Sequence, residues 1–184
     1  VGEFGAHMAA HRGIYPLQDS DLVLYANWLA EWGDLIIHAA GIDDQGEGYA
    51  FVGPSGAGKS TLVDYLASHD AATVLGEDQV IVRYQGARYL LYGTPWHTNP
   101  ARCAPGGVPL KKLFFLDRAA GHGVRKCGPM EGIERLLQDA FVPYYNRAGV
   151  GRILDNLSRL AEQVPFHILG FQLGSDVMKL IRDA

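Results

Sequence analysis

The stretch Gly53-Pro54-Ser55-Gly56-Ala57-Gly58-Lys59-Ser60, continued by Thr61, matches the pattern G-x-x-x-x-G-K-[ST] at every fixed position. This pattern is typical of a phosphate-binding loop, in which backbone N–H groups converge on a polyphosphate and glycines let the chain wrap tightly around it. Lys59 would add a positive charge for the outer phosphates, and the Ser60 hydroxyl would complete the coordination of Mg²⁺. The sequence therefore predicts a nucleotide-binding loop over residues 53–61.

The segments on either side of the loop have the order that such a loop requires. Residues 48–52 form a short apolar run rich in β-formers, which indicates a buried strand. Residues 61–67 place Leu62, Val63 and Leu66 at helical spacing, so a helix would present its positive N-terminal end to the anion. The alternative is a glycine-rich turn that matches by chance, but the order of strand, loop and helix favours the functional interpretation.

The bulk composition narrows the class of protein and of partner. The chain has 184 residues, of which 48% are hydrophobic and 20% charged, as expected for a single globular domain with a sizeable core. Its formal net charge of -4 provides no basic field for nucleic acid, and no apolar run approaches the ~20 residues of a membrane span. We therefore expect small molecules or proteins as partners, with no nucleic acid and no membrane.

Two further features bear on the compartment and on the domain boundary. Cys103 and Cys127 lack the paired C-x-x-C spacing of a metal site or redox motif, so we expect two reduced thiols in a cytoplasmic protein. Residues 1–8 end in His7-Met8 and resemble a vector-derived tail. We assign residues 9–184 to one domain.

Hydrophobic periodicity and turn residues predict an α/β fold with a mixed sheet flanked by helices. The predicted helices are residues 19–32, 61–67, 130–141, 146–163 and 175–183. The predicted strands are residues 35–42, 48–52, 72–75, 80–84, 88–92, 113–116 and 166–171, with antiparallel hairpins joining 35–42 to 48–52 and 80–84 to 88–92. Loops are expected at residues 94–109 and 121–129, and the first is where we expect selectivity for a second substrate.

An acidic pair, Glu77-Asp78, follows the predicted strand at residues 72–75. Asp78 lies 19 residues after Lys59, where a carboxylate could face a transferred phosphoryl group or its metal ion. The alternative is a solvated acidic pair at a turn. The argument for a functional carboxylate is that ligands in α/β folds bind at strand ends.

Other polar residues are open to two interpretations each. His38, within an apolar strand, is either a core residue with a satisfied hydrogen bond or a polar group aimed into the site. His97 either contacts a nucleotide or covers the core. Five basic residues are either phosphate clamps or surface charges: Arg83, Arg88, Arg102, Arg125 and Lys126. Phe141, Tyr144 and Tyr145 belong either to a homo-oligomer interface or to the core.

Four segments together resemble a known family. His38-Ala39-Ala40-Gly41, the phosphate loop, Glu77-Asp78-Gln79-Val80 and Gly93-Thr94-Pro95-Trp96 are similar to the catalytic domain of HPr kinase/phosphorylase and, more closely, to the diverse HPr kinase-like proteins. The similarity covers residues 34–117 most clearly. It implies a phosphoenolpyruvate carboxykinase-like P-loop fold and transfer of the γ-phosphoryl group of ATP to a serine hydroxyl of a protein.

The resemblance also implies roles for individual residues. Asp78 falls on the second acid of the family's Asp-Asp pair, the base for the acceptor hydroxyl, and Glu77 takes the place of the first acid. His38 falls on the active-site histidine, Lys59 on the loop lysine and Ser60 on the magnesium-binding serine; Asp78 is a further candidate ligand of the metal.

The chain departs from the HPr kinases themselves at several places. Glu77 replaces an Asp, Thr61 stands where those kinases have Glu, and their later glycine-rich signature with a second magnesium-binding carboxylate is missing. We therefore expect a kinase that uses ATP and Mg²⁺ on a serine of a peptide or of a protein other than HPr. Two alternatives remain: a nucleotide-binding regulatory module without catalysis, and a kinase of a small hydroxylated molecule.

Overall fold

The fold is built on two long strands, β1 (Leu35–Asp44) and β6 (Gly107–Leu116), each of which takes part in two sheets. The computed structural model describes residues 18–94, 104–174 and 176–184. The first half of β1 pairs antiparallel with β4 (Gln79–Gln85), and its second half pairs antiparallel with β2 (Glu47–Val52). The start of β6 pairs antiparallel with β5 (Arg88–Gly93), and the rest pairs in parallel with β2. Because β4 also pairs with β5, these five strands close into a ring.

Three more strands extend this arrangement. β3 (Thr73–Gly76) pairs antiparallel with the second half of β1. β8 (Phe166–Gly170) runs parallel to β6, and β7 (Gly123–Lys126) pairs antiparallel with β8 at the edge. The neighbouring strands β2, β6 and β8 are thus all parallel, so their carboxyl ends meet along one edge of the sheet. Ligands bind beyond that edge in α/β folds.

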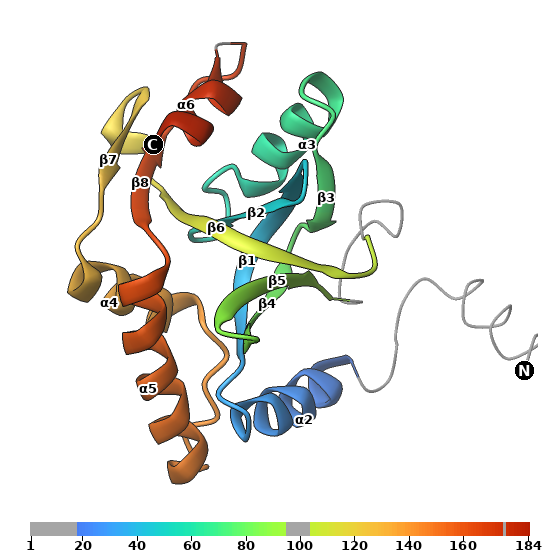
Figure 1. Cartoon of the computed structure of the whole chain (residues 1–184), viewed down its shortest axis with the longest axis vertical. Coiled ribbons are helices and arrows are strands. Elements are labelled where there is room, and N and C mark those ends of the chain that lie inside the picture. Colours follow the sequence, from blue (N-terminus) through green and yellow to red (C-terminus); the bar gives the residue numbers. More distant parts are fainter. Residues whose placement is uncertain (1–17, 95–103, 175) are drawn as a thin grey trace, which may run out of the picture.

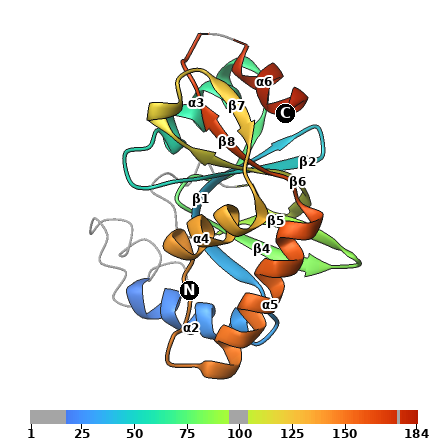
Figure 2. The same cartoon turned by 90° about the vertical axis from the view of Figure 1, so that its left-hand side faces the viewer.

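Helices cover the sheets at both ends of the molecule. Figures 1 and 2 show α3 (Lys59–His69) and α6 (Val177–Asp183) together at one end, with α2 (Gln18–Ala30) and α5 (Arg147–Gln163) at the other. α4 (Pro129–Asp139) lies beside α5. No helix within the described residues has both the length and the apolar composition that a membrane crossing requires.

Two large apolar cores explain why the strands read as nearly continuous hydrophobic runs. One core lies between β-strands and α3 plus α6, where the Phe51 and Phe114 rings stack with centroids 5.7 Å apart. The other lies between the two sheets and is closed by α4 and α5. β1 supplies Leu35, Ile37 and Ala39 to the second core and Ala40 and Ile42 to the first. A strand buried on both faces has no polar side to alternate with.

Most of the predicted elements are confirmed, including both antiparallel hairpins and the mixed sheet. Two predictions are wrong. The segment predicted as a loop at residues 121–129 contains β7, and the loop predicted at residues 94–109 ends earlier, because β6 begins at Gly107. β7 is a short strand at the edge of the sheet, and its partner β8 lies far away in the sequence. The start of β6 contains Gly107 and Pro109, residue types that favour a loop, and it is a strand because it pairs with β5. α2 ends at Ala30, two residues before the predicted end.

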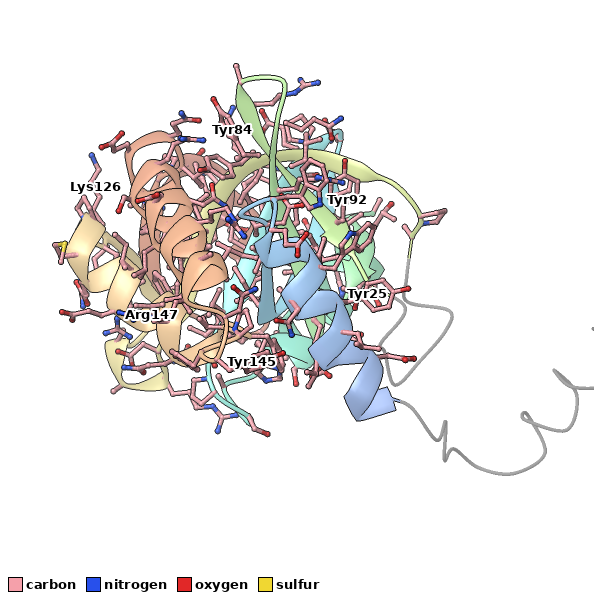
Figure 3. The ribbon with its side chains drawn as sticks, turned by 90° about the horizontal axis from the view of Figure 1, so that it is seen from below. Tyr25, Tyr84, Tyr92, Lys126, Tyr145 and Arg147 are labelled. Atoms are coloured by element: carbon pink, nitrogen blue, oxygen red, sulfur yellow. The ribbon has the colours of Figure 1, made fainter. Side chains whose placement is uncertain are left out.

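Several predictions concern residues outside the described part of the chain. These are the tail at residues 1–8 and the roles of His97, Arg102 and Cys103. Of the aromatic residues left open above, Phe141 packs against the small cluster of Ala26, Leu29 and Ile36. Tyr144 and Tyr145 are 71% and 70% exposed and so do not belong to the core of this chain. Tyr145 is labelled in Figure 3.

Candidate functional site

The phosphate loop connects the carboxyl end of β2 to the first turn of α3, as the sequence predicted. Gly56 and Gly58 have φ angles of 79° and 100°, which side chains other than glycine rarely adopt. At Gly58 a Cβ atom would also lie 3.1 Å from Cζ of Phe171. The loop therefore needs glycine at these two positions, while Pro54 and Ser55 between them and β2 are exposed.

Lys59, the cationic residue of the loop, is buried, with only 6% of its surface exposed. Its Nζ donates hydrogen bonds to the backbone oxygens of Gly53 (2.6 Å) and Pro54 (3.2 Å) and lies 2.9 Å from Nε2 of His38. Burial lowers the pKa of Lys59, and the nearby carboxylates of Asp139 and Asp78 raise it in part. The ammonium group is thus held beneath the loop and next to the histidine.

His38 lies where β1 changes partners. His38 pairs with Gln79 of β4, whereas the next residue, Ala39, pairs with Val52, the last residue of β2 before the loop. This position brings its ring between the loop and the start of β4. Of the two interpretations of His38, the structure supports a half-buried polar group that contacts Lys59 on one side and Asp78 on the other.

The contacts of His38 fix the roles of its two ring nitrogens. A charged Lys ammonium has only donors, so Nε2 of His38 must accept from Lys59. The proton of the neutral ring is then on Nδ1, which lies 3.3 Å from Oδ1 of Asp78. His38 therefore connects the loop lysine to the carboxylate that the sequence singled out.

The two acids of the pair differ in their surroundings. The Asp78 side chain is 44% exposed, and its backbone oxygen accepts a hydrogen bond from the Ala39 N–H at 3.1 Å, which fixes the turn against β1. Glu77 is only 5% exposed. Asp78 is therefore an accessible carboxylate in contact with His38, and the catalytic role of Glu77 stays a prediction.

Asp139, the last residue of α4, is a member of the site that the sequence analysis missed. An isolated antiparallel bridge joins Ile37 to Ala140, and the Phe141 N–H donates to the Ile36 oxygen at 2.9 Å. This register places Asp139 opposite His38, at the spacing of cross-strand neighbours. Burial raises the pKa of Asp139, while the nearby His38 and Lys59 lower it in part. No motif marks Asp139, because its place depends on how the segment after α4 lies along β1.

Two of the basic residues considered as phosphate clamps are engaged elsewhere. Arg83 forms an ion pair with Asp34 at 3.1 Å, and Arg125 forms one with Glu131 at 3.2 Å. Arg88 and Lys126 are exposed, on the β4–β5 hairpin and at the end of β7, respectively. These four residues are therefore better described as structural or surface charges.

Within the described residues, no three His, Cys, Asp or Glu side chains come together as a metal site. Mg²⁺ bound with a nucleotide needs only one or two protein ligands beside phosphates and waters. Ser60, exposed in the first turn of α3, has the chemistry for such a ligand. The assignment of Ser60 and Asp78 to magnesium stays a prediction.

Comparisons with known proteins give little beyond this geometry. No protein-family model matches the chain, and no curated protein matches it in sequence. Among solved structures it is similar to the HPr(Ser) kinase/phosphatase from Coxiella burnetii, with a TM-score of 0.47 and 11% identity over 80% of this chain and 88% of that chain. The function therefore has to be argued from the site.

Proposed function

We propose that this chain binds ATP with Mg²⁺ at the loop of residues 53–61 and transfers the γ-phosphoryl group to a hydroxyl, that of a serine in a peptide or protein. The observation that carries the proposal is the continuous contact from Lys59 through His38 to Asp78. It joins a cation suited to phosphate oxygens to a carboxylate suited to a hydroxyl proton.

The loop has the groups needed to hold a polyphosphate. A Cβ placed at Gly56 would meet nothing within 4 Å, so there is open space beside the loop backbone at this position. The Lys59 ammonium can exchange the carbonyl oxygens of Gly53 and Pro54 for phosphate oxygens, which are charged and therefore stronger acceptors. The Ser60 hydroxyl would hold Mg²⁺, which would supply positive charge to stabilise the charge spread over the phosphoryl oxygens.

In the transfer step, the acceptor hydroxyl oxygen forms a bond to the γ-phosphorus while the bond from that phosphorus to the oxygen of the ADP leaving group breaks. The hydroxyl proton passes to the Asp78 carboxylate. The Nδ1–H of His38 holds this carboxylate toward the loop, and the exposed side of Asp78 lets a large acceptor reach it. His38 is thus a positioning residue, and Asp78 is the base.

Transfer of labelled phosphate tests the proposal. The protein would be incubated with Mg²⁺ and ATP labelled at the γ-phosphate, together with a cell extract as the source of acceptors. We expect label on one main acceptor, which mass spectrometry would then identify as a peptide, a protein or a small hydroxylated molecule. Binding of ATP with neither transfer nor hydrolysis would contradict a kinase and would instead support a nucleotide-binding regulatory module.

A further inference from the structure

A pocket of about 200 Å³ lies beside the phosphate loop, on the side away from His38. Gly58 of the loop and Thr61 of α3 form one wall. The other wall comes from the segments that follow β6 and β8, namely Asp117 and Arg118 after β6 and Phe171 and Leu173 after β8. All three contributions lie at the carboxyl ends of the parallel strands β2, β6 and β8.

We propose that this pocket binds the nucleoside, that is the base and ribose, of the nucleotide whose phosphates occupy the loop. The inference rests on the proposed function, because it needs a nucleotide on the loop. The inference adds two points: the direction in which the nucleotide lies across the loop, and the residues that let the protein bind a nucleotide in preference to an inorganic polyphosphate.

The order of the strands sets this direction. β2, which carries the loop, pairs with β1 on one side and with β6 on the other. His38 and Asp78 lie on the β1 side, and the pocket lies on the side of β6 and β8. A nucleotide with its phosphates on the loop would therefore extend its terminal phosphate toward His38 and its nucleoside toward Phe171.

The residues of the pocket suit a nucleoside. The Phe171 ring lies so close to Gly58 that a Cβ there would be 3.1 Å from its Cζ, and it offers a flat apolar surface on which a base can stack. Leu173, 46% exposed, adds apolar surface at the rim. The Asp117 carboxylate accepts a hydrogen bond from the Ala119 N–H at 2.8 Å, which fixes the turn after β6. The same carboxylate can also accept hydrogen bonds from ribose hydroxyls. Arg118 adds a positive charge to the lining of the pocket.

Calorimetric titration with two ligands, Mg-ATP and Mg-tripolyphosphate, tests the pocket separately from the loop. The wild type should bind ATP more tightly than tripolyphosphate, because only ATP has a nucleoside. Phe171→Ala should weaken ATP binding about 5- to 150-fold, the range found for loss of one base-stacking aromatic residue, and should narrow the ratio of the ATP affinity to the tripolyphosphate affinity. Leu173→Ala should narrow the ratio by a smaller factor. Tyr144→Ala, which removes an exposed ring far from the loop in sequence, is the control and should leave both affinities unchanged.

The ratio of the affinities for ATP and tripolyphosphate also distinguishes a loss of nucleoside binding from an indirect disturbance of the loop. If Phe171→Ala merely disturbed Gly58, both ligands would lose affinity together and the ratio would stay at its wild-type value, which would overturn the pocket assignment. Equal affinity of the wild type for ATP and tripolyphosphate would overturn it too, while leaving phosphate binding at the loop intact. A wild type that bound neither ligand would overturn the proposed function along with the pocket.

Discussion

Lys59, His38, Asp78 and Asp139 come from four different segments, and the two carboxylates act on the charge of Lys59. The lysine is buried and has one carboxylate on either side of its histidine neighbour. A buried cation needs such neighbours, because burial alone would favour its neutral form. Asp78 and Asp139 therefore help to keep Lys59 protonated, and the protonated lysine is the form that binds phosphate.

Removal of the Asp78 charge should affect chemistry more than binding. Asp78→Asn keeps the shape of the side chain but cannot take up the hydroxyl proton, so we expect a loss of about 10²-fold or more in transfer rate with little change in affinity for Mg-ATP. Rates of labelled-phosphate transfer and calorimetric affinities would be measured side by side. Asp155→Asn, at an exposed position of α5, is the control. Turnover near the wild-type rate in Asp78→Asn would remove this residue from the base role.

Asp139→Asn should shift the pH dependence of nucleotide binding. Lys59 binds phosphates as a cation, so the affinity for Mg-ATP falls as the pH rises through the pKa of Lys59. Burial already lowers this pKa and Asp139 partly offsets the effect. Loss of the Asp139 charge should lower the pKa of Lys59 further, so the fall in affinity should begin at a lower pH.

Titrations of Mg-ATP across the alkaline range would measure that shift. Glu134→Gln removes a charge from an exposed position of the same helix and should leave the profile unchanged. If Asp139→Asn also had the wild-type profile, Asp139 would not act on Lys59.

At the level of single elements, the junction between α2 and β1 contains a buried acid. The Asp34 side chain is 2% exposed and has Arg83 as its ion-pair partner. Burial raises the pKa of Asp34 to about 6, an increase that Arg83 only partly offsets. The folded state therefore binds a proton more readily than the unfolded state, in which the pKa is near the usual 3.8.

This difference in the pKa of Asp34 predicts the direction in which the free energy of unfolding changes with pH. Between pH 6 and pH 4 the folded protein binds more protons at Asp34, so this residue should increase the free energy of unfolding as the pH falls. Urea denaturation from pH 7 to pH 4.5 would measure the effect as the difference between the wild type and Asp34→Asn. The increase attributable to Asp34 should be missing from the variant. Identical pH dependence of the two proteins would show that Asp34 has no raised pKa.

The elements that could be predicted from sequence are those whose signal is local. The hairpin of β4 and β5 has apolar runs rich in β-formers on either side of Gln85-Gly86-Ala87, and a fixed motif joins the strand to the helix around residue 53. β7 was missed because only its pairing with β8 makes it a strand. Asp139 was missed for the same reason, since its approach to His38 depends on the bridge between Ile37 and Ala140.

For the whole molecule, one ion pair connects the last helix, α6, to the end of the long strand β1. Arg182 of α6 donates to both carboxylate oxygens of Asp44 at 2.8 Å, and the Asp44 side chain is 7% exposed. This ion pair links α6 to the end of β1. Both elements pack on the core that lies against α3 and α6, and Ala57 of the phosphate loop packs on the same core. The pocket proposed for the nucleoside is equally non-local, since Gly58, Arg118 and Phe171 meet only in the folded chain, and no sequence pattern could have joined them.

Arg182→Ala should therefore be costly, because it leaves a buried carboxylate without its cation. We expect a loss of about 2 kcal/mol in the free energy of unfolding, measured by urea denaturation. Lys111→Ala breaks the pair with Glu47, whose side chains are 52% and 45% exposed, and should cost no more than about 0.5 kcal/mol. Equal losses in the two variants would show that the Asp44 pair does not anchor α6.

The most direct check on nucleotide binding at the loop is calorimetric titration of Mg-ATP into the wild type, Lys59→Ala and Lys111→Ala. The wild type and Lys111→Ala should bind one nucleotide per chain with similar affinity. Lys59→Ala should bind at least about tenfold more weakly, because it loses a charge-assisted hydrogen bond to phosphate. Unchanged affinity in Lys59→Ala, or no binding by the wild type, would contradict a nucleotide site built on this loop.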